Sequence, residues 1–168
     1  MDGNEMLLSP TGVDQLRTAL IRAGYTSSGI AERLGPSATA GLARNDLRAA
    51  LRETQDRDPL ATLIRLFVCA QTEPEAAVAA ALSPLPLDEA LAGGLIERVP
   101  GGLRQGVELE PYGDTWWVLS DVPAGARPGQ PLPSDHVLGI GGSSTTLVGA
   151  PVGGPVGRAL DLGTGCGV

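Results

Sequence analysis

The chain has 168 residues, of which 42% are hydrophobic and 3% aromatic, and its formal net charge is −7. This length allows one domain plus part of another, with a core built from Leu, Ala, Val and Ile. The acidic balance argues against strong non-specific binding of nucleic acid, because affinity for phosphate comes from clustered positive charge. The two Cys and the single His lack metal-ligand spacing, so we expect no metal site.

The N-terminal residues do not resemble a targeting segment. Asp2 and Glu5 stand where a secretory signal would have basic residues before an apolar run, and no apolar stretch approaches the length of a membrane span. We therefore expect a cytoplasmic protein without membrane contact.

Residues 9 to about 93 have the pattern of several short helices. Ser9-Pro10 is typical of a helix start and Gly24 of a helix end. A second short helix from about Ser28 is expected to stop at Gly35-Pro36. The predicted apolar face of the first helix consists of Val13, Leu16, Leu20 and Ile21.

The most regular apolar pattern follows Asp58-Pro59, a second typical helix start. Its members recur at i, i+3, i+4, i+7 and i+8, which predicts a helix at the centre of the core. They are Leu60, Leu63, Ile64, Phe67 and Val68. Further helices are expected around 43–51, over 75–82 after a capping box that begins at Thr72, and over 87–93.

Beyond residue 93 the periodicity becomes that of strands. Residues 95–99 and 103–110, joined by Pro100-Gly101-Gly102, are predicted to form a β-hairpin, with 115–119 as a third strand. Helices followed by such a hairpin, or wing, indicate a winged-helix-like domain over residues 1–120. The predicted fold class is therefore α+β and mainly helical.

Arg98 and Arg104 flank the turn of this hairpin, and a wing of this kind can contact nucleic acid. Glu97, Glu108 and Glu110 on the same strands offset that charge, so simple solvation is the favoured interpretation.

Trp116 and Trp117 alternate across the third strand, so one is expected in the core and the other at a domain joint. Residues 121–134 are rich in Pro and Gly and are interpreted as an exposed linker. His136 follows this linker, and a lone histidine is more often structural than catalytic. Gly141–Thr146 fits either a helix start whose N–H groups bind an anion or a capped turn.

The strongest functional signal is Asp161-Leu-Gly-Thr-Gly-Cys-Gly167. An apolar run with the pattern of a buried strand leads into this motif. Its glycines, Gly163, Gly165 and Gly167, allow a sharp turn and close approach of a ligand. A bare G-x-G-x-G is expected by chance about 0.5 times in this glycine-rich chain, but the acidic and apolar neighbours lower that to below about 0.01. A dinucleotide fingerprint would need glycine where Val168 stands, which disfavours NAD.

This motif, with Pro155-Val-Gly-Arg-Ala-Leu160 before it, resembles the first motif of class I S-adenosylmethionine-dependent methyltransferases. Residues 135–147 are similar to the preceding segment in actinobacterial methyltransferases related to the HemK/PrmC and small-methyltransferase groups, which carry an extra N-terminal domain. The resemblance implies that a Rossmann-like α/β domain begins at residue 135. It also implies S-adenosyl-L-methionine as cofactor, held by Asp161, Gly163, Gly165 and Gly167.

Later motifs of that family do not occur in the chain: an acidic residue at the end of the second strand and an Asn-Pro-Pro-Tyr type tetrapeptide. We therefore expect an N-terminal part of a longer enzyme, inactive alone, with its catalytic residues beyond Val168. The methyl acceptor would be a protein glutamine, a nucleic-acid base or a small molecule. The alternative is a winged-helix regulatory or interaction module without catalysis.

Overall fold

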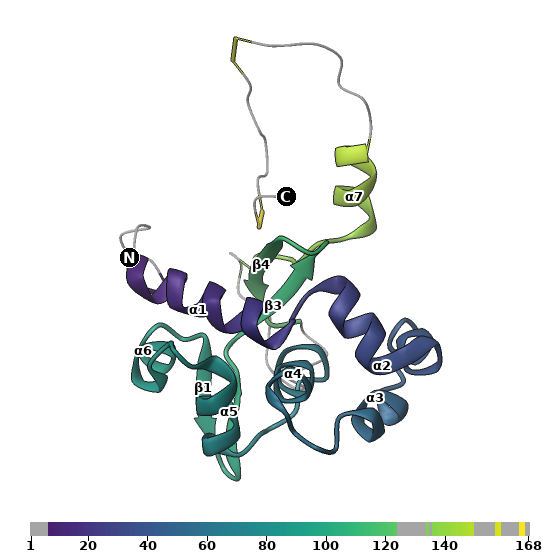
Figure 1. Ribbon diagram of the computed structural model, residues 1–168. Helices are drawn as coiled ribbons and strands as arrows, with labels where there is room; N and C mark the ends of the chain where they lie inside the picture. The colour runs from purple at the N-terminus through teal and green to yellow at the C-terminus, as the bar shows by residue number, and fades with distance from the viewer. Residues whose placement is uncertain (1–6, 124–133, 135, 150–156, 159–164, 167–168) are drawn as a thin grey trace.

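The computed structural model describes residues 7–123, 134, 136–149, 157–158 and 165–166. Their fold is α+β, as predicted, and combines helices with two separate two-stranded antiparallel sheets. In Figure 1 the other helices gather on one side of the hairpin formed by β3 (Val107–Tyr112) and β4 (Trp116–Asp121), while α7 (Gly142–Gly149) projects from its other side. Of the linker predicted at 121–134, Asp121 belongs to β4, and residues 124–133 lie outside the described residues.

Helix α1 (Pro10–Ala23) begins and ends where the sequence predicts. The Ser9 hydroxyl accepts a hydrogen bond from the Gly12 N–H at 3.0 Å, and Gly24 ends the helix in the left-handed conformation with φ 70°. The predicted apolar face is only half right. Leu16 and Leu20 are buried, whereas Val13 and Ile21 are 50% and 60% exposed.

The break expected at Gly35-Pro36 is present. Helix α2 (Ser27–Leu42) is interrupted there, because Gly35 has φ 71° and ψ 171°, a conformation that side chains disfavour. The short helix α3 (Arg48–Glu53) follows and packs against α2.

The predicted central helix is confirmed as the middle of the core. Helix α4 (Pro59–Leu63) starts where Asp58 accepts a hydrogen bond from the Ala61 N–H at 2.7 Å, and it continues directly into the π-helical segment η1 (Ile64–Val68). Leu63, Ile64 and Phe67 are buried in the main hydrophobic cluster.

The capping box predicted at Thr72 is wrong. Helix α5 (Glu75–Leu82) has Pro74 at its N-cap and no side-chain cap. Glu73 instead lies fully buried, with Oε2 at 2.9 Å from Arg57 Nε and Oε1 at 2.5 Å from Arg65 Nε. The two guanidinium groups offset the cost of burying this carboxylate. Helix α6 (Leu87–Ala92) follows as predicted.

The strand prediction needs one correction, at Gly106. Strand β1 (Ile96–Val99) pairs with β2 (Gly102–Gln105), but residues 103–110 do not form one strand. After Gly106, β3 (Val107–Tyr112) pairs with β4 (Trp116–Asp121) in a second hairpin. A Cβ on Gly106 would lie 2.0 Å from the Gly94 carbonyl oxygen, so this close approach requires glycine.

Residues 142–149 form helix α7 (Gly142–Gly149), so the glycine-serine-threonine segment is a helix start. Thr145 and Thr146 donate hydrogen bonds to the carbonyls of Gly141 and Gly142, at 2.8 and 2.7 Å. Among the described residues, no helix is long and apolar enough to cross a membrane.

Candidate functional site

Three side-chain hydrogen bonds hold the β3–β4 hairpin against the corner between α1 and α2. Tyr25 Oη donates to the Leu109 carbonyl at 2.8 Å, and Ser27 Oγ donates to the Pro111 carbonyl at 3.1 Å. Trp117 Nε1 donates to the Tyr25 carbonyl at 2.6 Å. The hairpin is therefore fixed to the helices through β3 and through the indole of Trp117.

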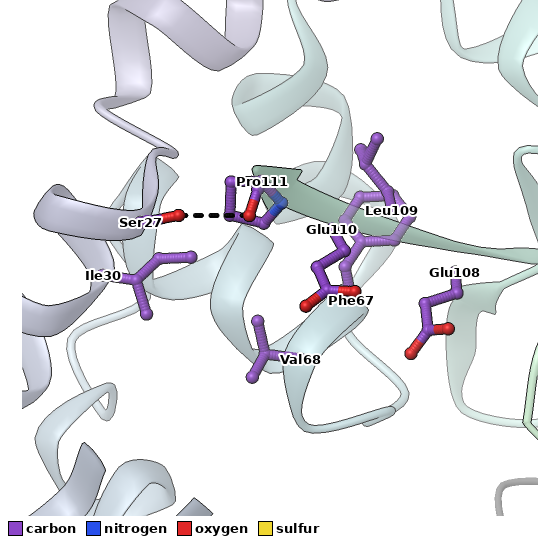
Figure 2. Close-up of a pocket in the computed structure, with 8 residues that line it drawn as sticks. All are labelled: Ser27, Ile30, Phe67, Val68, Glu108, Leu109, Glu110 and Pro111. Atoms are coloured by element: carbon purple, nitrogen blue, oxygen red, sulfur yellow. Dashed lines mark hydrogen bonds between the residues drawn. The ribbon is translucent and has the colours of Figure 1, made fainter. Parts of the chain in front are cut away.

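A cavity of about 270 Å³ lies beside this attachment (Figure 2). Its walls combine apolar side chains of α2 and η1 with residues of β3. They are Ser27, Ile30, Phe67, Val68, Glu108, Leu109, Glu110 and Pro111. Figure 2 shows the side chains of Glu108 and Glu110 leaving β3 in the same direction.

The two glutamates give this cavity a negative potential. Partial burial, and then the charge of Glu108, raise the pKa of Glu110 above its ordinary range. Burial, and then the charge of Glu110, raise the pKa of Tyr25 far above its usual value, so this tyrosine stays neutral. Glu108 Oε2 also accepts a hydrogen bond from Ser120 Oγ at 3.0 Å. In the described parts of the chain, no group of three His, Cys, Asp or Glu side chains is placed to hold a metal ion.

A second polar cluster lies at the end of β4, where residues 136–137 approach this strand. Asp121 N–H donates to the Val137 carbonyl at 3.0 Å, and Val137 N–H donates to Asp121 Oδ2 at 2.8 Å. The same carboxylate oxygen lies 3.5 Å from His136 Nδ1, and the histidine side chain is only 9% exposed. The single histidine therefore helps to join residues 136–137 to β4.

Gly139 also lies close to the β3–β4 hairpin, against side chains of both strands. A Cβ at this position would lie 2.7 Å from Glu108 Oε2 and 3.0 Å from Ser120 Oγ. The segment that precedes α7 thus passes close over the β3–β4 hairpin, and a larger residue at 139 would push these side chains away.

Of the four predicted cofactor residues, only Gly165 lies within the described residues; Asp161, Gly163 and Gly167 lie outside them. Gly165 has φ 54°, in the left-handed region where a side chain is disfavoured. Gly165 and Cys166 line a cavity of about 450 Å³ together with Leu7, residues of β3 and β4, and the segment that follows His136. Asp121 and Val137 are among these residues.

Asp121 lies 3.5 Å from His136 Nδ1 and lines one cavity with Gly165, and the sequence predicts neither relationship. Asp121 ends β4, beyond the predicted strand 115–119, and residues 122–135 separate it in sequence from His136, so no local spacing connects these residues. The two cysteines are both free. Burial raises the pKa of the Cys69 thiol to about 11, so this thiol stays protonated and unreactive at neutral pH.

A family model described as "Domain of unknown function (DUF7059)" matches residues 22–106, just over half of the chain. The chain belongs to this family. The DUF7059 match begins near the end of α1 and stops at Gly106, the residue that separates β2 from β3. The β3–β4 hairpin, His136 and Gly165 therefore lie outside the DUF7059 region. No curated protein and no solved structure matches the chain.

Proposed function

We propose that this chain carries the substrate-recognition domain and the first cofactor motif of an S-adenosylmethionine-dependent methyltransferase. The observation that carries the proposal is the compound motif Asp161-Leu-Gly-Thr-Gly-Cys-Gly167, with its acidic residue, its three glycines and the apolar run before it. The proposed division is a winged-helix-like domain at 1–120, a linker at 121–134 and the start of a Rossmann-like domain at 135. The proposed location is the cytoplasm.

The residues present fit the chemistry of this cofactor. The left-handed φ of Gly165 gives a backbone turn without a Cβ, which a ligand can approach closely. The Asp161 carboxylate would balance the ammonium of the methionine part, and Gly163, Gly165 and Gly167 would leave room for the methionine and ribose. When bound, S-adenosyl-L-methionine supplies an electrophilic methyl group.

The β1–β2 hairpin would be the wing of the recognition domain, but its arginines do not favour nucleic acid as the acceptor. Arg98 pairs with Glu75 through two hydrogen bonds, one of them 3.0 Å long. Arg104 Nε lies 2.8 Å from Glu97 Oε1. Because both positive charges are paired, we infer that this part does not bind nucleic acid strongly and non-specifically. The acceptor remains a protein glutamine, a base or a small molecule.

The test uses the protein expressed from its complete gene. S-adenosyl-L-methionine binding is measured by calorimetry, and methyl transfer by release of S-adenosylhomocysteine in the presence of cell extract. Gly165→Val places a branched side chain at a left-handed turn, so cofactor affinity should fall by about a hundredfold or more. Asp161→Asn keeps the hydrogen-bonding shape but loses the charge, so affinity should fall by about tenfold.

Gly142→Ala is the matched control, because a Cβ on Gly142 meets no atom within 4 Å. It should bind the cofactor as the natural protein does. If Gly165→Val binds the cofactor normally, the glycine run is only a turn, and the alternative of an interaction module without catalysis replaces the enzyme.

A further inference from the structure

The two outer edges of the β3–β4 hairpin differ. On β3, Pro111 has no N–H to offer, and the carbonyls of Leu109 and Pro111 already accept hydrogen bonds from Tyr25 and Ser27. The outer edge of β3 cannot pair with another strand. Its carbonyl groups at Leu109 and Pro111 are already hydrogen-bonded within the chain, and Pro111 interrupts its row of N–H donors.

Among the described residues, the outer edge of β4 is open at Trp117 and Leu119. Asp121 N–H bonds to Val137 on the side away from β3, and N–H groups along a strand alternate in direction. The N–H and C=O groups of Trp117 and Leu119 therefore point outward as well. Within the described residues, this edge makes no backbone hydrogen bond besides the one at Asp121.

An apolar groove of about 390 Å³ lies beside this edge, between β4 and α1. The side chains that line it include two that are well exposed: Trp116 at 71% and Val13 at 50%. Leu119, on β4 itself, is 38% exposed. An open strand edge next to exposed apolar side chains is the arrangement that binds an extended peptide by strand addition.

Arg17 indicates that a segment bound in this groove carries a negative charge. It is the one charged side chain among the described residues that line the groove, it is exposed, and it forms no ion pair with any residue that the structure describes. In a chain with a net charge of −7, this guanidinium marks a local site for a carboxylate.

A second copy of the chain fits this edge less well. Antiparallel pairing of two β4 strands about Val118 would set Thr115 of the second copy opposite Asp121. Val137 already bonds there. Two copies would also bring together two net charges of −7.

We propose that β4 binds an extended segment of a partner protein as a third strand. Its alternate apolar side chains enter the groove beside Trp116 and Val13, and a carboxylate on the segment pairs with Arg17. This inference goes beyond the proposed methyltransferase activity, because binding at β4 requires neither S-adenosyl-L-methionine nor the glycine motif.

The experiment measures fluorescence anisotropy of a labelled peptide of about eight residues in which Val alternates with Thr after an N-terminal Glu. The partner is the 168-residue chain and its variants. Val13 and Ile21 give a matched pair, since both are exposed apolar residues of α1 and only Val13 lines the groove. Val13→Glu and Arg17→Glu should each weaken binding by about tenfold or more, and Ile21→Glu should not change it.

Two further measurements isolate the strand edge. A peptide with N-methylated amides cannot pair with a strand, so its affinity should fall by about tenfold or more. Leu119→Pro removes an outward N–H and should have the same effect, with circular dichroism checking that the hairpin stays folded. Equal affinity of Val13→Glu and Ile21→Glu would overturn the proposal, as would no binding up to about 1 mM peptide. A dimer of the chain that Leu119→Pro abolishes would also overturn it, because a second copy would then occupy the edge.

Discussion

The indole Nε1 of Trp117 and the carbonyl oxygen of Tyr25 lie 2.6 Å apart and form a hydrogen bond between residues that are 92 positions apart in the sequence. Trp117 therefore ties the β3–β4 hairpin to the end of α1, whereas its neighbour Trp116 is 71% exposed.

These two tryptophans provide the first prediction. Trp117→Phe removes the donor and leaves a carbonyl unsatisfied, so the free energy of unfolding should fall by about 1–2 kcal/mol. Trp116→Phe should change it by less than about 0.5 kcal/mol. Urea unfolding followed by circular dichroism gives both values, and equal losses would show that the bond to Tyr25 does not stabilise the fold.

The buried carboxylate of Glu73 provides the second prediction. Glu73→Gln leaves Arg65, whose side chain is 12% exposed, without its counter-charge, and the free energy of unfolding should fall by about 3 kcal/mol. Glu75→Gln is the control, since Glu75 forms an exposed pair with Arg98 and should contribute less than about 1 kcal/mol. Chemical unfolding of both variants measures the difference. Similar effects at the two positions would mean that burial of Glu73 is not what makes its ion pairs important.

Glu110 gives the third prediction, on pH dependence. Its pKa is raised in the folded state by partial burial and by Glu108. Between the ordinary range of glutamate and the raised pKa, the native state binds more protons than the unfolded chain, so the contribution of Glu110 to stability falls as pH rises.

Glu110→Gln should therefore melt at a higher temperature than the natural chain at pH 7, and the difference should disappear as the pH falls below about 4. Thermal unfolding across this range is the measurement. A difference in melting temperature that does not vary with pH would show that the side-chain amide acts by some means other than its missing charge.

Gly106 gives the fourth prediction. Gly106→Ala places a Cβ against the Gly94 carbonyl and forces the backbone to shift, so the free energy of unfolding should fall by about 2 kcal/mol or more. Gly142→Ala adds a methyl group in open space on α7 and should be neutral or slightly stabilising. Calorimetry on both variants compares them, and a stable Gly106→Ala would mean that β2 and β3 can separate without glycine.

Signals carried by neighbouring residues were sufficient for much of the helical region. Ser9-Pro10 and Asp58-Pro59 act within one turn of the helix that each begins, and the spacing of Leu63, Ile64 and Phe67 reflects a single buried face. These interactions are local, so a sequence pattern can predict them.

Features that depend on distant contacts were not predictable in the same way. The residues of the predicted strand 103–110 give no sign of a break, because the close approach that requires glycine at position 106 is to the carbonyl of the distant Gly94. Thr72 and Glu75 match a capping box, but no side chain caps α5, and Glu73 between them pairs with Arg57 and Arg65, which lie 16 and 8 positions earlier in the chain. The candidate site follows the same rule: the glycine motif is visible in sequence, whereas the approach of Asp121 to Gly165 depends on the fold.

The unequal edges of the β3–β4 hairpin also limit how large an assembly can grow from it. Fibrous aggregation by strand addition requires each added unit to present a fresh edge to the next. Here Pro111 and the hydroxyl groups of Tyr25 and Ser27 close one side, so pairing at β4 would end with a single added partner. An exposed strand edge beside tryptophan ordinarily promotes aggregation. In this hairpin the blocked β3 edge limits strand pairing to one partner per chain.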